Sequence, residues 1–291
     1  MANGYSLHIG LNLVDPAHYN GWDGRLKGCE ADARDMAAIA QAGGYSERKM
    51  LLTGDATSAR VISEVVALAK KLEAGDILLL SYSGHGGQIP DESGEEDDRY
   101  DETWCLYDRQ LIDDEIYRLL GKFKPGVRVL VLSDSCHSGT VTRMRVDAGG
   151  PGADQLVRQQ SRSAAAIGQE DLGDDVRPRL APLDVTMDAY NEHKGLYLAL
   201  QSASAGAEST PPQARVILLS GCMDNQVSLD GANNGMFTGT LKKVWNAGAF
   251  NGGYNLFYQT IVSRMPPSQT PNFFRVGEVG PDFVNQKPFT I

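Results

Sequence analysis

Two continuous apolar runs stand out in the hydrophobic pattern, and each ends in a turn of small residues. Residues 76–82 (Asp-Ile-Leu-Leu-Leu-Ser-Tyr) lead into Ser-Gly-His-Gly-Gly, and residues 127–132 (Val-Arg-Val-Leu-Val-Leu) lead into Ser-Asp-Ser-Cys-His-Ser-Gly. Apolar runs of this length predict central strands of a parallel sheet, buried on both faces. The turns present one imidazole, His85, and one thiol, Cys136, just beyond the two strands.

Strands and helices alternate along most of the chain. The pattern predicts further strands at 6–14, 49–52, 215–219 and 272–276, and helices at 28–42, 57–72, 112–123, 188–202, 235–247 and 256–264. This alternation predicts one α/β domain over residues 1–291, with a mostly parallel sheet covered by helices on both faces and 272–276 as an edge strand. Residues at about 144–186 mix Gly, Pro, Ser and charge without periodicity, which predicts a long exposed loop or insertion.

Composition and charge exclude several classes of function. The net charge of −10 disfavours nucleic acid as a partner and favours cationic ligands. No run of 18 uninterrupted apolar residues exists, so we expect no membrane span, and the N-terminal residues lack the pattern of a secretory signal. We therefore expect a cytoplasmic protein with reduced thiols rather than two disulfides. The four cysteines form no CxxC pair, which disfavours a zinc or thioredoxin site; they are Cys29, Cys105, Cys136 and Cys222.

The two strand ends carry the residue types that nucleophilic catalysis needs. Sites in open parallel sheets form at the carboxyl ends of strands, and 51 residues between His85 and Cys136 leave room for one crossover helix between neighbouring strands. A thiolate that attacks a carbonyl creates an oxyanion, which the backbone N–H groups of Cys136 and Gly86 would stabilise. His85 would then donate a proton to the leaving amine.

Simpler interpretations of the same residues remain open at this point. Taken singly, Cys136 is a buried structural cysteine and His85 a histidine of the core. His137 is a second candidate base, although adjacent side chains usually diverge. The glycine-rich turn around His85 could also bind phosphate, but it lacks the Gly-Lys-Ser/Thr of a P-loop. Two glycine-flanked reactive residues at two strand ends favour the nucleophile and base.

Several blocks of the chain resemble the metacaspases, caspase-like cysteine peptidases of family C14. The matching blocks are Tyr82-Ser-Gly-His-Gly, Asp134-Ser-Cys-His-Ser-Gly, Leu26-Lys-Gly-Cys-Glu-Ala-Asp, Asp113-Asp-Glu, Ser220-Gly-Cys-Met-Asp-Asn-Gln and Asn234-Gly-Met-Phe-Thr. The resemblance covers most of the chain except about 144–186. Within the family, the chain is similar to the compact type I-like or prokaryotic form (orthocaspase). It implies a caspase-like three-layer α/β/α sandwich and a cysteine endopeptidase.

The resemblance also implies cleavage after Arg or Lys, with Asp32, Asp134, Ser83 and Cys29 lining the pocket for the residue before the cleaved bond (P1). Carboxylates that receive a guanidinium fork suit this preference. Without the resemblance, Asp32 is a surface helix carboxylate and Asp134 a turn-forming residue. Asp224 is a weaker candidate for the same pocket.

An acidic stretch at residues 91–102 holds eight carboxylates and one arginine. A solvated, self-repelling loop is the simpler interpretation, and the stretch has no EF-hand pattern. The resemblance implies calcium activation, with Asp101, Asp113 and Asp114 as metal ligands. Arg143 stands where a further acidic ligand is expected, which weakens the case for calcium. No other cofactor is expected.

The expected partners are protein or peptide substrates with a basic P1 residue. Irregular exposed segments are where proteolysis concentrates, so self-cleavage within 144–186 is predicted, with a passive insertion as the alternative. The arginines of this stretch are Arg145, Arg158, Arg162, Arg177 and Arg179. By resemblance the chain is expected to be a monomer. Two other functions remain open, namely a catalytically quiet caspase-like scaffold or interaction protein, and acyl transfer or ligation by the same dyad.

Overall fold

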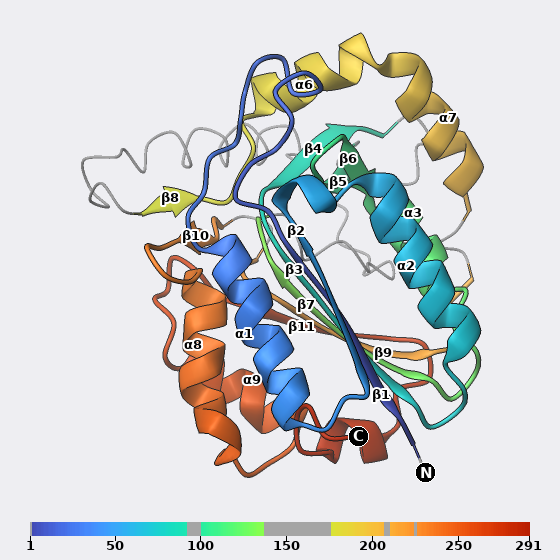
Figure 1. Cartoon of the computed structure of the whole chain (residues 1–291), viewed down its shortest axis with the longest axis vertical. Coiled ribbons are helices and arrows are strands. Elements are labelled where there is room, and N and C mark those ends of the chain that lie inside the picture. The colour runs from blue at the N-terminus through green and yellow to red at the C-terminus, as the bar shows by residue number, and fades with distance from the viewer. Residues whose placement is uncertain (1, 92–99, 137–175, 207–209, 224–225) are drawn as a thin grey trace, which may run out of the picture.

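A six-stranded sheet forms the centre of the computed structural model, which describes residues 2–91, 100–136, 176–206, 210–223 and 226–291 (Figure 1). Its strands lie in the order β11-β9-β7-β3-β1-β2. These strands are β1 (Gly4–Gly10), β2 (Glu47–Leu52), β3 (Ile77–Ser83), β7 (Arg128–Asp134), β9 (Arg215–Ser220) and β11 (Asn272–Val276). Only β11 pairs antiparallel in this sheet, at its edge, which confirms both the mostly parallel sheet and the predicted edge strand.

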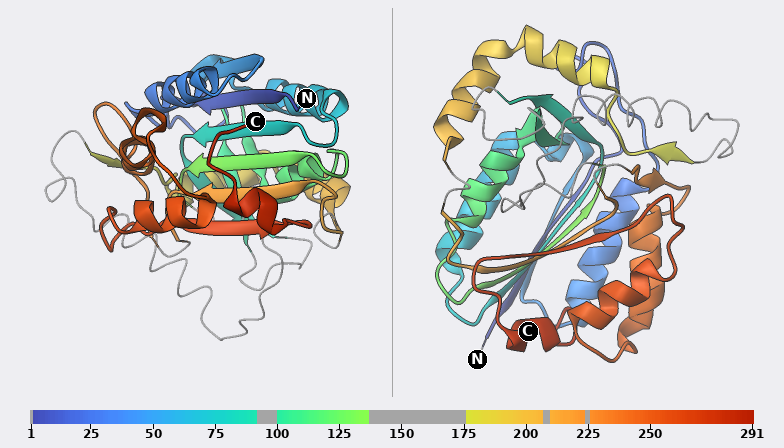
Figure 2. Two further views of the ribbon diagram at one scale, coloured as in Figure 1. Left: turned by 90° about the horizontal axis from the view of Figure 1, so that it is seen from below. Right: turned by 180° about the vertical axis from the view of Figure 1, so that it is seen from behind.

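Helices cover both faces of the sheet and make three layers (Figure 2). They are α1 (Cys29–Ala42), α2 (Ser58–Lys71), α3 (Asp113–Leu120), α6 (Leu183–Glu192), α7 (Lys194–Ser204), α8 (Met236–Trp245), α9 (Tyr254–Val262) and α10 (Pro281–Asn285). Successive residues of a strand point to opposite faces. In β3, Leu78 and Leu80 pack in the core under α2 and α3, whereas Ile77 and Leu79 pack in the core under α1, α8 and α9. The predicted α/β/α sandwich is thus confirmed.

Two small sheets lie outside the central one and were not predicted. A three-stranded antiparallel sheet consists of β4 (Gly86–Pro90), β5 (Tyr100–Cys105) and β6 (Gln110–Ile112). A two-stranded antiparallel sheet pairs β8 (Arg177–Pro178) with β10 (Leu229–Asp230). In Figure 1 the first of these sheets lies at the top, near the carboxyl ends of the central strands.

The prediction of an exposed loop up to residue 186 is wrong for its last part. Arg179 is 0% exposed and Ala181 is buried, and α6 begins at Leu183. The segment is irregular because its side chains are held by contacts distant in sequence rather than by a local period. Residues 137–175, with Arg143, Arg145, Arg158 and Arg162, lie outside the described residues.

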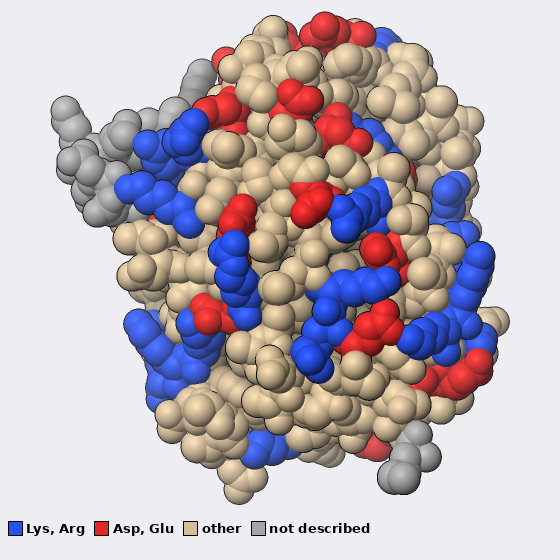
Figure 3. All heavy atoms as spheres, in the orientation of Figure 1, with Lys and Arg blue, Asp and Glu red and all other residues tan. Residues whose placement is uncertain are grey.

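The state of the cysteines, the length of the helices and the distribution of surface charge can be compared with the predictions made from composition. None of the four cysteines forms a disulfide, as predicted, and all four are buried. No helix among the described residues combines the length and the apolar character needed to cross a membrane. On the face that Figure 3 shows, basic and acidic side chains are interspersed rather than gathered into one patch of a single sign.

Candidate active site

The two reactive residues identified in the sequence lie just beyond adjacent strands. β3 and β7 pair in parallel, with Ser83 opposite Asp134 at their carboxyl ends. His85 and Cys136 each follow these positions by two residues and are buried, at 5% and 0% exposure. The predicted neighbouring strands are therefore present, and the imidazole and the thiol belong to turns at the same edge of the sheet.

The glycines on both sides of His85 are required by close packing of the backbone. A Cβ atom on Gly84 would lie 2.6 Å from the Tyr82 hydroxyl oxygen, and one on Gly86 would lie 1.8 Å from the carbonyl oxygen of Cys136. Both separations are far below van der Waals contact, so a larger residue would displace the Tyr82 ring at Gly84 and the Cys136 backbone at Gly86. The Gly-His-Gly sequence thus allows the histidine turn to lie directly against the cysteine turn.

The imidazole of His85 is held neutral with one ring nitrogen available. Its Nε2 lies 3.0 Å from the carbonyl oxygen of Gly24, an acceptor that requires the proton on Nε2. Nδ1 then has the lone pair, and this buried atom has no hydrogen-bond partner among the described residues. Burial lowers the pKa of His85 to about 4, although the hydrogen bond to Gly24 acts in the opposite direction. The Trp22 ring packs beside the imidazole, with centroids 4.7 Å apart.

The thiol of Cys136 points toward the residue that precedes β10. The Ser228 N–H donates a hydrogen bond to Sγ at 3.0 Å, and Sγ lies 3.7 Å from the Ser228 carbonyl oxygen. Among the described residues, Sγ and the His85 ring form no hydrogen bond in this conformation. The direct contact between thiol and imidazole stays a prediction.

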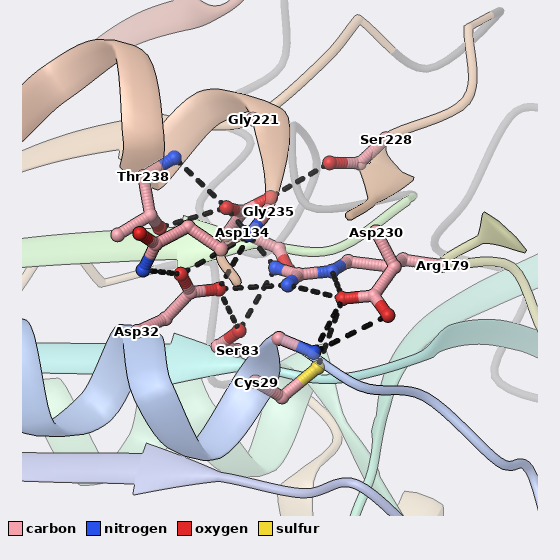
Figure 4. Close-up of polar contacts among 12 residues, drawn as sticks. Cys29, Asp32, Ser83, Asp134, Arg179, Gly221, Ser228, Asp230, Gly235 and Thr238 are labelled. Atoms are coloured by element: carbon pink, nitrogen blue, oxygen red, sulfur yellow. Dashed lines mark hydrogen bonds and ion pairs between the residues drawn. The ribbon is translucent and has the colours of Figure 1, made fainter. Parts of the chain in front are cut away.

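A buried pocket with three carboxylates adjoins the two strand ends (Figure 4). Asp134 ends β7, Asp32 lies in the first turn of α1, and Asp230 ends β10; each is 1–2% exposed. Ser83 donates a hydrogen bond to Asp32 at 2.7 Å, and the Cys29 sulfur lies 4.0 Å from an oxygen of Asp230. The structure therefore brings together all four residues that the resemblance assigned to a pocket.

Donors from α8 hold two of the carboxylates in place. The backbone N–H of Gly235, which caps α8, donates to both oxygens of Asp32 at 3.1 and 3.2 Å. Asp134 accepts hydrogen bonds from the Thr238 backbone N–H at 2.9 Å and from its hydroxyl at 2.7 Å. A Cβ on Gly235 would lie 2.4 Å from Asp134 Oδ2, so only glycine fits beside the pocket. The first turn of α8 thus stabilises the negative charge of the pocket.

Arg179 fills this pocket with its guanidinium group. Its Nη2 donates to Asp32 at 2.7 Å and to Asp230 at 2.8 Å. Its Nη1 donates to the Ser83 hydroxyl at 2.8 Å and lies 3.0 Å from Asp134 Oδ2. Nε also approaches Asp230, at 3.3 Å. The planar fork of one arginine therefore contacts all three carboxylates.

The charges of the pocket favour a cation strongly. Burial alone would lower the pKa of Arg179, but the negative charge of Asp134 and of its neighbours raises this pKa well above its usual value. Burial raises the pKa of Asp32, and the charge of Asp134 raises it further, while Arg179 acts in the opposite direction. Three acidic groups thus surround one positive charge, and their burial would be costly without it.

The main chain around Arg179 is also bound at the strand ends. β8 pairs antiparallel with β10, and the Arg179 N–H donates to the Ser228 carbonyl oxygen at 2.8 Å. The Arg179 carbonyl oxygen accepts hydrogen bonds from the N–H groups of Gly86 at 3.0 Å and of Cys136 at 3.2 Å. The two N–H groups that the sequence analysis assigned to an oxyanion site therefore converge on one carbonyl oxygen.

Two important residues of this site had no signal in the sequence patterns. Asp230 lies between the late motif blocks, and Arg179 lies in the stretch predicted to be exposed. The other candidates, His137 and Asp224, lie outside the described residues.

The acidic residues assigned to calcium lie in a different place. Asp101 is on β5, and Asp113 and Asp114 begin α3; all three are buried. Asp101 accepts a hydrogen bond from Gln201 at 2.6 Å. In the described ranges, no group of three or more His, Cys, Asp or Glu side chains could hold a metal ion, and residues 92–99 lie outside these ranges. The described residues alone therefore do not make a calcium site.

Calcium activation stays a prediction and is decided by a rate comparison. If calcium activates the protein, hydrolysis of an arginyl peptide should rise several-fold with millimolar calcium chloride and fall to the basal rate with a chelator. Magnesium chloride at the same concentration is the control for ionic strength. Equal rates with calcium and with chelator would remove calcium from the account.

Comparisons with known proteins agree with this geometry. The family model described as the caspase domain (Peptidase_C14) matches residues 12–277. Metacaspase-1A of Aspergillus fumigatus is 32% identical over 262 residues, covering 81% of this chain and 58% of that protein. Metacaspase-1 of Mycosarcoma maydis is 31% identical over 255 residues, covering 80% of this chain and 59% of that protein. The chain thus spans less than two thirds of the length of these relatives.

A crystal structure covers nearly the whole chain. It is that of protein GSU0716 from Geobacter sulfurreducens, which is 48% identical to this chain. The match covers 99% of this chain and 98% of that one, with a TM-score of 0.85. The arrangement of sheet and helices described above is therefore shared by a protein of nearly the same extent.

Proposed function

The chain belongs to the caspase-domain peptidase family, and from this membership we propose that it is a cysteine endopeptidase that cleaves peptide bonds after Arg or Lys. Its named relatives are metacaspases. In this proposal Cys136 is the nucleophile and His85 is the general acid and base. Asp32, Asp134 and Asp230 bind the basic P1 side chain, and no metal takes part in the steps below.

The observation that carries the proposal is the guanidinium seated among three buried carboxylates beside Cys136. A pocket for an acidic P1 residue would need cationic donors, and here the only cation among the described pocket residues is its occupant, Arg179. The fork of arginine satisfies several acceptors at once, whereas an ammonium acts as a point charge. We therefore expect Arg to be preferred to Lys, and both to be far better than Asp.

The mechanism follows from the groups at the strand ends. His85 Nδ1 takes the proton of the Cys136 thiol, and the thiolate sulfur attacks the carbonyl carbon of the P1 residue. The N–H groups of Cys136 and Gly86 bind the oxyanion that forms. The imidazolium then gives its proton to the leaving nitrogen, the C–N bond breaks, and a thioester remains. Water, deprotonated by His85, hydrolyses this thioester and restores the thiol.

A peptide series that differs only at P1 tests this specificity. The Arg peptide should have the highest kcat/KM, Lys should follow within about tenfold, and Asp should lie at least about 1000-fold below Arg because it would bring a fourth buried negative charge. Release of a fluorescent leaving group from each peptide gives the rates. A better rate with Asp than with Arg would overturn the assignment of the pocket.

The alternative of a catalytically quiet scaffold is separated by covalent labelling. An electrophile with an arginyl group should modify Cys136 if the thiol is reactive, and mass spectrometry of the digested protein locates the label. An unlabelled Cys136 together with no peptide hydrolysis would favour the scaffold.

Acyl transfer differs from hydrolysis only in the acceptor of the acyl group, and an added amine would then appear in the products. A monomeric state and a cytoplasmic location stay predictions.

A further inference from the structure

The segment around Arg179 contacts the candidate active site in the manner of a bound substrate. Its side chain occupies the carboxylate pocket, and its carbonyl oxygen accepts hydrogen bonds from the N–H groups of Gly86 and Cys136. A buried arginine that served only to balance the carboxylates would need the first set of contacts. The second set goes further, because it places the Arg179 carbonyl oxygen on the two N–H groups assigned to the oxyanion.

The backbone on both sides of this carbonyl group is fixed as well. Before it, the Arg179 N–H donates to Ser228, and β8 pairs with β10, with Pro178 opposite Leu229. After it, the Ala181 N–H donates to the Gly86 carbonyl oxygen at 2.8 Å. An extended peptide that adds to the edge of a short strand is a common way for a protein to bind a peptide.

The position of the histidine completes the arrangement. Leu180 forms an isolated bridge with Gly86, the residue next to His85. After burial and the hydrogen bond to Gly24, the backbone of Leu180 is among the groups that influence the pKa of His85, so this backbone lies close to the ring. The nitrogen of Leu180 is the leaving group of the bond after Arg179. The bridge thus holds the backbone of Leu180 beside the turn that presents the imidazole, whose buried Nδ1 has no hydrogen-bond partner among the described residues.

We propose that Arg179 is the P1 residue of a substrate segment built into this chain, so that the intact chain blocks its own pocket until it cleaves the Arg179–Leu180 bond. This proposal rests on the proposed function, since it uses the same nucleophile and the same pocket. It narrows the predicted self-cleavage from the whole stretch of about 144–186 to a single bond. It also adds a regulatory role, because the segment that is cut is the one that excludes other substrates.

The chemistry of this step balances within the chain. The Cys136 sulfur bonds to the carbonyl carbon of Arg179, and His85 passes the thiol proton to the nitrogen of Leu180. The C–N bond breaks, leaving Leu180 as a new N-terminal amine and Arg179 as a thioester. Water hydrolyses the thioester to the Arg179 carboxylate, with thiol and neutral imidazole restored.

Cleavage weakens the hold of the segment on the pocket. Before cleavage the segment competes with other substrates from within the same chain, at a high effective concentration. Afterwards Arg179 ends in a carboxylate beside three buried acidic groups, and its tie to Ala181 and the residues beyond is lost. The main-chain support that remains before the cut is the hydrogen bond from the Arg179 N–H to Ser228 and the pairing of two residues between β8 and β10. Departure of the arginine is then favoured, and the pocket opens to substrates in solution.

Fragment analysis of four full-length proteins tests the proposal. Wild type should yield a fragment whose N-terminal residue is Leu180, identified by intact mass and N-terminal sequencing. Arg179→Gln should be cut at least about 100-fold more slowly, because the pocket loses its charged ligand. Arg179→Lys should be cut at the same bond at an intermediate rate. Arg177→Gln is the matched control. Arg177 is a half-buried arginine two residues away, and within the described ranges its side chain donates to the Arg25 carbonyl oxygen and not to the carboxylate pocket, so this variant should be cut as wild type.

A second measurement addresses the blocked pocket without requiring cleavage. In a Cys136→Ala background, which cannot cut, a fluorescent peptide ending in arginine should bind at least about tenfold more tightly when Arg179→Gln is added. Equal binding with and without Arg179→Gln would show that the segment does not block the pocket. Thermal unfolding of each variant shows whether it is folded, and the wild-type fragment decides the cleaved bond even if Arg179→Gln unfolds.

The outcomes separate this proposal from the proposed function. If arginyl peptides are hydrolysed but the wild-type fragment begins elsewhere, or Arg179→Gln is cut as fast as wild type, the internal substrate is wrong and the peptidase stands. If wild type hydrolyses arginyl peptides fully before any cut at Leu180, the regulatory role is wrong. If neither peptides nor the chain are cut after arginine, the proposed function itself fails.

Discussion

Cys136→Ala should lower kcat/KM for the arginyl peptide by at least about 10⁴-fold. Without the sulfur no acyl-enzyme forms, and the N–H groups that bind the oxyanion have no covalent intermediate to stabilise. The fold should persist, because the change removes only a sulfur atom from a small apolar cluster and its hydrogen bonds with the backbone of Ser228, which leaves little empty volume. Initial rates of peptide hydrolysis, with thermal unfolding of the same samples, measure both effects.

Cys222→Ala is the matched control for this change. Cys222 is also fully buried and packs in the same apolar cluster as Cys136. Its sulfur lies 3.7 Å from the Ser135 carbonyl oxygen and 3.5 Å from that of Gln226. Cys222 does not contribute one of the two N–H groups assigned to the oxyanion. We expect its activity within about threefold of wild type. If both alanine variants lost activity equally, packing of the cluster would explain the loss, and Cys136 would no longer be the assigned nucleophile.

Asp230→Asn should lower kcat/KM for an arginyl peptide by about 100-fold, and less for a lysyl peptide. Asp230 Oδ1 contacts both Nε and Nη2 of the bound guanidinium, at 3.3 and 2.8 Å. A lysine has no equivalent of Nε, so it loses a smaller part of its binding. Asparagine keeps an oxygen that can accept from the Gly28 N–H but removes the charge. The ratio of kcat/KM for the arginyl peptide to kcat/KM for the lysyl peptide, measured in the same P1 series, should therefore decrease.

Asp35→Asn separates a pocket effect from a change of local charge. Asp35 lies on α1 three residues after Asp32, and its carboxylate accepts hydrogen bonds from Asn234 and Lys242 rather than from Arg179. We expect Asp35→Asn to change both rates by less than about twofold, since a partly exposed carboxylate contributes little at a distance. Unchanged rates and an unchanged ratio for Asp230→Asn would remove Asp230 from the pocket.

The fold was predictable where the hydrophobic period is strong. The two central strands were expected at 76–82 and 127–132, and they are observed at Ile77–Ser83 and Arg128–Asp134. β4 was missed because Gly86-Gly-Gln-Ile-Pro contains two glycines and a proline, which locally oppose a strand. The pairing of β4 with β5 and the packing at the end of the central sheet override this preference.

The candidate site was predictable only where a motif marks it. Asp32 and Ser83 belong to blocks that resemble a known family, and the structure places both in the pocket. Asp230 reaches the pocket through the pairing of β10 with β8, a contact between residues about fifty positions apart that no local pattern reveals. Arg179 was assigned to an exposed stretch because the residues around it mix Gly, Pro, Ser and charge without periodicity. Its burial depends on three carboxylates brought in from other parts of the chain.

A protein substrate that pairs with β10 as β8 does must adopt an extended conformation over the residues that precede its basic side chain. A helix or a buried strand presents no such stretch until it opens, so the free energy of local unfolding in the target adds to the barrier of cutting it. Stable globular neighbours should therefore survive, while hinges between domains, trailing ends and misfolded chains are degraded first. The selection of substrates would then depend on the local stability of a protein as much as on the number of its arginines.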